Sequence, residues 1–150
     1  GLRAGTENVA GIVGLGVAAR LAAEALPKYA KLAELRDELE RRLRDIAPDM
    51  IVFGQASERL PNTCKMTMPG VPGDTQVMAM DLAGIAISAG SACAAGKVDA
   101  PYVLSAMGVA DEISNTSTRV SLGWRTQPED LDKFVAAWEN LYHRLGRKAA

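Results

Sequence analysis

The chain of 150 residues contains few of the side chains on which metal and disulfide sites are built. It has two cysteines, Cys64 and Cys93, and a single histidine, His143. Two cysteines are too few for a disulfide framework, and their separation is not that of metal ligands. One histidine excludes any site that needs two imidazoles. We therefore predict no metal site, and we expect free thiols in a reducing cytoplasm.

The chain also lacks an excess of charge of either sign. Its 17 basic and 18 acidic residues give a net charge of −1, which favours neither nucleic acid nor an anionic membrane as a partner. No uninterrupted apolar run approaches the roughly 20 residues that span a bilayer, so we predict no membrane partner. The apolar content of 48% suffices for the core of one domain. Because the chain begins at Gly1 without a leader, we expect it to be part of a longer polypeptide.

Three segments have the composition or the periodicity of helices. Residues 8–26 are rich in alanine, glycine and aliphatic side chains, which predicts a buried helix that packs against a larger body. Pro27 should then kink or break the helix. Residues 28–47 repeat apolar side chains every three or four positions, as one face of an amphipathic helix does. A capping box with proline at 126–129 opens the last helix, whose apolar face consists of Leu131, Phe134, Val135, Trp138, Leu141, Tyr142 and Leu145.

Short apolar runs bounded by glycine or proline predict strands at 50–53, 63–68, 84–87 and 118–122. Short helices are expected at 74–82 and 101–107, the second ending before Gly108. Residues 88–96, SAGSACAAG, have the smallest side chains of the chain and predict a loop. Helices followed by short strands and short helices indicate a small two-layer α/β (α+β) unit.

Cys93 lies in this loop, between Gly90 and Gly96. A thiol in such a loop is accessible, and it acts as a nucleophile when its pKa is lowered. A small residue in a tight turn is the alternative reading. Cys64 belongs to an apolar strand run instead, so we predict that it lies in the core.

Two further residues are candidates for binding anions. Arg119 interrupts the β-forming run 118–122, and its planar fork suits bidentate capture of a carboxylate. The alternative is an edge-strand arginine that faces water. Thr6 precedes the first helix, where a hydroxyl and free backbone amides form an anion site. The alternative is an ordinary helix cap by Thr6.

Four runs in this order resemble the cysteine desulfurases of iron–sulfur cluster assembly, which are class V aminotransferases of the fold-type I pyridoxal-phosphate group. They are GLRAGTENVAGIVGLGVA, SAGSACAAG, APYVLSAMG and TRVSLGWRTQPEDLDKF. The resemblance implies that Cys93 attacks the sulfur of L-cysteine and holds it as a persulfide. It also implies that Arg119 binds the substrate α-carboxylate, and that Thr6 reaches the cofactor phosphate of the neighbouring subunit in a homodimer.

The resemblance further implies the small C-terminal domain of a fold-type I transferase, a short mixed sheet covered by helices. Residues 1–26 would be an interdomain helix on a large domain, and residues 27–150 the small domain. L-alanine and a persulfide for an iron–sulfur scaffold or another acceptor protein would be the products.

The chain lacks the motif with which the family binds its cofactor. The Ser-x-His run that precedes the family's cofactor lysine is absent, so we expect the chain alone to be inactive. Two alternatives stay open: a stand-alone persulfide carrier, and another class V enzyme in which Cys93 is incidental.

Overall fold

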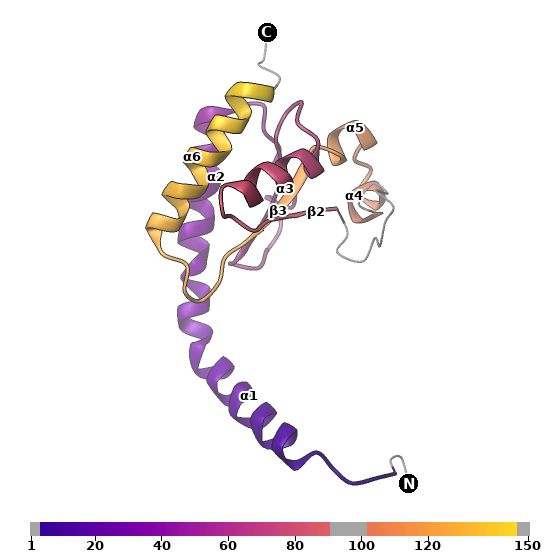
Figure 1. Ribbon diagram of the computed structural model, residues 1–150, viewed down its shortest axis with the longest axis vertical. Helices are drawn as coiled ribbons and strands as arrows, with labels where there is room; N and C mark the ends of the chain where they lie inside the picture. Colours follow the sequence, from indigo (N-terminus) through magenta and orange to yellow (C-terminus); the bar gives the residue numbers. More distant parts are fainter. Residues whose placement is uncertain (1–3, 91–101, 147–150) are drawn as a thin grey trace.

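The computed structural model describes residues 4–90 and 102–146 and consists of a small helix-covered sheet from which one long helix projects (Figure 1). Helices α2, α3 and α6 pack around the sheet, whereas α1 extends away from this body. The elements, in chain order, are α1 Val9–Ala30, α2 Leu32–Ile46, β1 Thr63–Thr67, α3 Gly73–Leu82, β2 Ser88–Ala89, α4 Tyr102–Ala106, α5 Asp111–Ser114, β3 Ser117–Ser121 and α6 Pro128–Leu145.

The three strands are arranged in the order β1-β3-β2, and both pairs are antiparallel. The expected mixed sheet is therefore wrong in this detail, because no two of the described strands pair in parallel. β1 and β2 run in the same direction, but β3 lies between them and takes the backbone hydrogen bonds of both. The prediction of a small α/β unit is confirmed.

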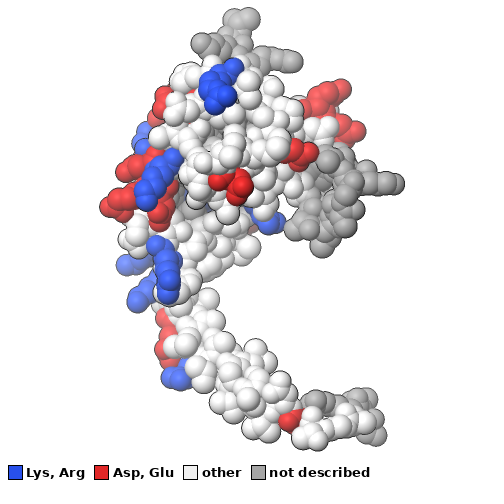
Figure 2. All heavy atoms as spheres, in the orientation of Figure 1, with Lys and Arg blue, Asp and Glu red and all other residues white. Residues whose placement is uncertain are grey.

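Pro27, at which a kink or a break was expected, does not break the long first helix. α1 continues through Pro27 as far as Ala30, and α2 begins only at Leu32, after Lys31. No residue of α1 is buried. Figure 2 shows that much of its surface is free of charge. Its charged residues are Arg20 and Glu24, which form an ion pair of 3.8 Å, and Lys28 in its last turn.

The core lies between the sheet and two amphipathic helices whose apolar faces are as predicted. On α2, Leu32, Leu39 and Leu43 are buried. On α6, the predicted face is buried from Leu131 to Tyr142, and only Leu145, in the last turn, is 51% exposed. α2 and α6 pack against each other and, with strand residues such as Met66, close one continuous core.

Two of the four segments predicted as strands, residues 50–53 and 84–87, do not form strands in the structure. Residues 50–53 contribute only one antiparallel bridge, from Val52 to Met66. The run 84–87 is not a strand because Gly84, at φ +74°, ends α3 and the Ile85 amide donates to Met80 O at 2.9 Å. Pairing begins only at Ser88.

Candidate functional site

The predicted carboxylate-binding residue, Arg119, lies in the middle of the central strand β3 and is exposed. Its partners across the sheet are Lys65 on β1 and Ser88 on β2. Arg119 Nη2 lies 3.5 Å from Ser88 Oγ, at the upper limit of a hydrogen bond. Arg119 is thus on a central strand, which overturns the edge-strand alternative, while its guanidinium is open to solvent.

Lys65 is a second cation at this site that the sequence analysis did not single out. It is half-buried on β1, directly opposite Arg119, and directly opposed residues of an antiparallel pair point to the same face. Burial, and to a lesser degree the charge of Arg119, lowers the pKa of Lys65 from 10.5 to about 8. The alternation of apolar residues with Lys65 in TCKMTM was the signal that could have placed it on the polar face.

The strand that carries Arg119 is held from its buried side. Thr118 Oγ1 donates to Gln76 Oε1 at 3.0 Å, and both side chains are almost completely buried. Gln76 Nε2 in turn donates to Val71 O at 2.9 Å and to Thr116 O at 2.7 Å. These bonds join α3 to β3 and so fix the position of the neighbouring Arg119.

The start of α3 approaches the end of the sheet closely. A Cβ atom at Gly73 would lie 3.0 Å from both Ala89 Cβ and Ser117 O, so any larger residue here would have to displace these neighbours slightly. The contact holds β2 in place next to β3. The chain leaves β2 and Gly90 toward the predicted nucleophile Cys93, which lies outside the described residues.

Thr6 lies in the extension before α1 and is exposed. The structure does not bring Thr6 and Arg119 together, because the segment before α1 lies at the far end of this long helix from the sheet that contains β3 (Figure 1). The helix cap is Asn8, whose Oδ1 accepts a hydrogen bond of 2.9 Å from the Gly11 amide. The alternative role of Thr6 as the cap is therefore wrong, and its hydroxyl makes no hydrogen bond within the described residues.

The other cysteine, Cys64, is 2% exposed and lies in the core, as predicted. Burial, followed by the nearby carboxylate of Glu40, raises the pKa of its thiol far above the usual range. A thiol in this setting stays protonated and is not a nucleophile.

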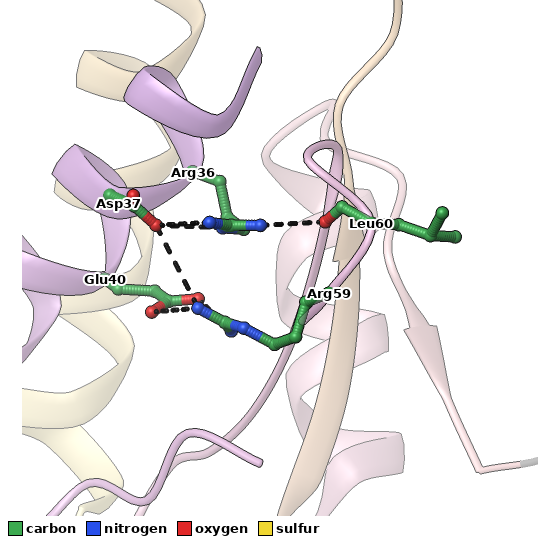
Figure 3. Close-up of polar contacts among 5 residues, drawn as sticks. All are labelled: Arg36, Asp37, Glu40, Arg59 and Leu60. Carbon is green, nitrogen blue, oxygen red and sulfur yellow. Dashed lines mark hydrogen bonds and ion pairs between the residues drawn. The ribbon is translucent and has the colours of Figure 1, made fainter. Parts of the chain in front are cut away.

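Glu40 belongs to a charged cluster that ties α2 to the segment before β1 (Figure 3). Arg59 binds Glu40 through two contacts, Nη1–Oε1 at 2.6 Å and Nη2–Oε2 at 3.1 Å. Arg36 donates to Asp37 and, through Nη1, to Leu60 O at 2.9 Å. The cluster lines a cleft of about 430 Å³, but its charges are already paired with one another. We therefore assign it a structural role.

The sequence profile described as aminotransferase class-V matches residues 1–134. The chain belongs to this family. The resemblance seen in the sequence is thereby confirmed.

Relatives of this class-V chain include a cysteine desulfurase from Klebsiella pneumoniae, which is 36% identical over 145 residues, 97% of this chain and 36% of the relative. A cysteine desulfurase IscS from Dictyoglomus turgidum is 38% identical over 144 residues, 95% and 36% of the two chains. The solved NifS-like protein from Rickettsia africae matches with a TM-score of 0.80 at 32% identity, over 94% of this chain and 36% of that one. The class-V chain thus spans about 36% of the length of these relatives.

Proposed function

We propose that this class-V chain forms the substrate-binding and sulfur-accepting part of a pyridoxal-phosphate-dependent cysteine desulfurase. The observation that carries the proposal is the exposed guanidinium of Arg119 beside β2, the strand from which the chain runs on to Cys93. Cys93 lies five positions after Ser88 in the sequence, and five residues of chain span at most about 18 Å. The length of chain between Ser88 and Cys93 therefore permits the proposed contact between the Cys93 thiol and a substrate whose carboxylate is bound at Arg119.

The residues present fit the cofactor only in part. Thr6 offers an exposed hydroxyl, a group suited to phosphate. The sole imidazole, His143, lies 3.4 Å from Glu139 on α6, and no Ser-x-His-Lys run is present. We infer that the remainder of a longer protein holds pyridoxal phosphate and its lysine, and that Thr6 contacts the cofactor phosphate of the neighbouring subunit in a homodimer.

In the proposed reaction, the bound cofactor acts as an electron sink. The Cys93 thiolate forms a bond to the sulfur of L-cysteine, and the Cβ–S bond of the substrate breaks. The electron pair of that bond remains with the carbon skeleton, which takes up a proton. L-cysteine and Cys93–SH thus give L-alanine and Cys93–S–SH. An iron–sulfur scaffold or another acceptor protein in the cytoplasm then takes the terminal sulfur.

The exposed helix α1 fits an interdomain role for residues 1–26. By length and composition α1 could cross a membrane, since an 18-residue window has a mean hydropathy of 1.7 and is 0% buried. A helix that is apolar on all sides is equally typical of the interior of a larger protein. The structural match covers 94% of the chain and so includes most of α1. We therefore propose that α1 packs on the large domain, not in a bilayer, and that residues 27–150 form the small domain.

The test uses the protein in which this chain is joined to a segment that carries the cofactor lysine, and it measures L-alanine formed from L-cysteine. Cys93→Ser should abolish alanine formation and the protein-bound persulfide detected by mass spectrometry. The matched variant Cys64→Ala should retain both, because Cys64 is sealed in the core. Absence of activity in the wild-type protein, or full activity of Cys93→Ser, would contradict the proposal.

A further inference from the structure

A row of side chains crosses the polar face of the sheet at the level of Arg119. Lys65 lies opposite Arg119 on one side, and Ser88 lies opposite it on the other. The antiparallel bridge from Val52 to Met66 continues the row, because it places Phe53 beside Lys65, and the Phe53 amide donates to Lys65 O at 2.9 Å. Lys65 therefore has an aromatic residue on one side and a guanidinium on the other.

This arrangement is unfavourable unless an anion shares it. Like charges directly opposite each other destabilise a strand pair, and partial burial of Lys65 removes water that would screen them. Within residues 4–90 and 102–146, neither Lys65 nor Arg119 forms an ion pair with a carboxylate. By contrast, the buried Glu40 is paired with Arg59. The two unpaired cations thus differ from the charged cluster on α2, which balances itself.

We propose that Lys65 is a second carboxylate-binding residue, so that the substrate α-carboxylate is bound between the Lys65 ammonium and the Arg119 guanidinium. The proposal rests on the desulfurase function proposed above and extends it to a residue outside the motifs that carry the resemblance. The two cations play different parts. The planar fork of Arg119 sets the orientation of the carboxylate, whereas the ammonium of Lys65 adds a point charge that needs no fixed geometry. The Ser88 hydroxyl lies on the far side of Arg119, 3.5 Å from the guanidinium.

The proposal predicts a binding effect that is separate from catalysis. Lys65 contacts a group of the substrate that does not react, so its loss should weaken ground-state and transition-state binding equally. The KM for L-cysteine should rise with little change in kcat. Lys65 should also be replaceable by arginine, which keeps the charge.

The experiment measures binding of 3-mercaptopropionate, which has the carboxylate and thiol of the substrate but no amine, to the cofactor-loaded full-length protein by isothermal titration calorimetry. Lys65→Met keeps the aliphatic stem and removes the charge, and it should bind the probe about tenfold more weakly, as expected for losing one charged hydrogen bond. Lys65→Gln is a second neutral variant with the same expected result should the methionine variant not fold. Lys65→Arg should bind within about twofold of the wild type, and so should Lys133→Met, a neutralised surface lysine on α6.

The outcomes separate this inference from the proposed function. Weaker binding in the neutral variants, with recovery in Lys65→Arg and an unchanged kcat, supports the role of Lys65. If Arg119→Met weakens binding and the neutral Lys65 variants do not, the inference is overturned while the desulfurase proposal stands. If neither position affects binding of the probe, both assignments of a carboxylate site are overturned. A fall in kcat at unchanged affinity also overturns the role of Lys65.

Discussion

The two faces of the small sheet carry alternate residues of the same strands, yet their surroundings are opposite. On the inner face, Met66 and Thr118 are directly opposed and almost completely buried. On the outer face, Lys65 and Arg119 are directly opposed, and Arg119 is exposed. The inner pair satisfies its packing and hydrogen bonding within the chain, whereas the outer pair leaves two positive charges without an acidic partner among the described residues. The inner face thus contributes to stability, and the outer face is the one on which the carboxylate site is proposed.

The largest effect on stability is expected for Met66→Ala on the inner face. Met66 is 0% exposed, so truncation leaves a cavity, and the free energy of unfolding should fall by about 2–5 kcal/mol. Chemical denaturation measures the loss. Ser121→Ala, an exposed position of β3 on the outer face, is the control and should change stability by less than about 0.5 kcal/mol. Equal losses at both positions would remove the distinction between the faces.

Thr118→Val should cost about 1–3 kcal/mol of unfolding free energy, because Gln76 Oε1 loses the hydroxyl that donates to it at 3.0 Å. The same substitution at Thr63 is the control. Thr63 Oγ1 donates to Asn62 Oδ1, which keeps the hydrogen bond from Tyr29 OH at 2.8 Å. A Thr63→Val loss as large as that of Thr118→Val, in the same denaturation experiment, would contradict the anchoring role of Gln76.

A smaller effect should appear in the pH dependence of stability. The pKa of Lys65 is about 8 in the folded protein against 10.5 in a model side chain, so between these values the unfolded chain binds more protons. The free energy of unfolding should therefore rise with pH across this range. Below pH 8, where Lys65 is charged in both states, its burial should lower the free energy of unfolding by the full amount. Denaturation of the wild type and of Lys65→Met should show that the methionine variant is more stable at pH 7. That advantage should shrink toward pH 10. A difference that is independent of pH would contradict the lowered pKa.

The smallest effect on stability is expected for Arg119→Met. The guanidinium is exposed, and its contact with Ser88 Oγ is 3.5 Å long, so the change in unfolding free energy should stay within about 0.5 kcal/mol. Affinity for the carboxylate probe should nevertheless fall, since this residue is proposed to orient the anion. Thermal unfolding in the absence of ligand, measured beside calorimetric binding, checks both parts. A marked loss of stability would mean that Arg119 is a structural residue.

The sequence predicted helices more accurately than it predicted the sheet, for a physical reason. The faces of α2 and α6 repeat over many residues, and such a period determines which side is buried. β2 has only two residues, and the neighbouring run at 84–87 is more apolar but is engaged in ending α3. Whether so short a segment forms a strand depends on its pairing with β3 and not on its own composition.

The site was predictable to different degrees. Arg119 was found because it interrupts a run of β-forming residues, while Lys65 was overlooked because it lies among methionines and threonines that read as one apolar strand. The alternative reading of Thr6 as the cap of α1 was wrong by two residues, since Thr6 and Asn8 are both good caps and the sequence does not say at which residue the helix begins. The roles of Cys93 and Thr6 remain predictions that rest on the family resemblance.

The sealed position of Cys64 has a practical consequence for measurement. Its thiol is both inaccessible and held in the unreactive protonated form, so a maleimide reagent added to the native protein would modify this position very slowly. Of the two cysteines in this chain, Cys93 is therefore the one at which rapid labelling is expected. Within this chain a fluorescent or paramagnetic probe would thus attach first at Cys93, and the slower labelling of Cys64 would report the rate at which the core opens.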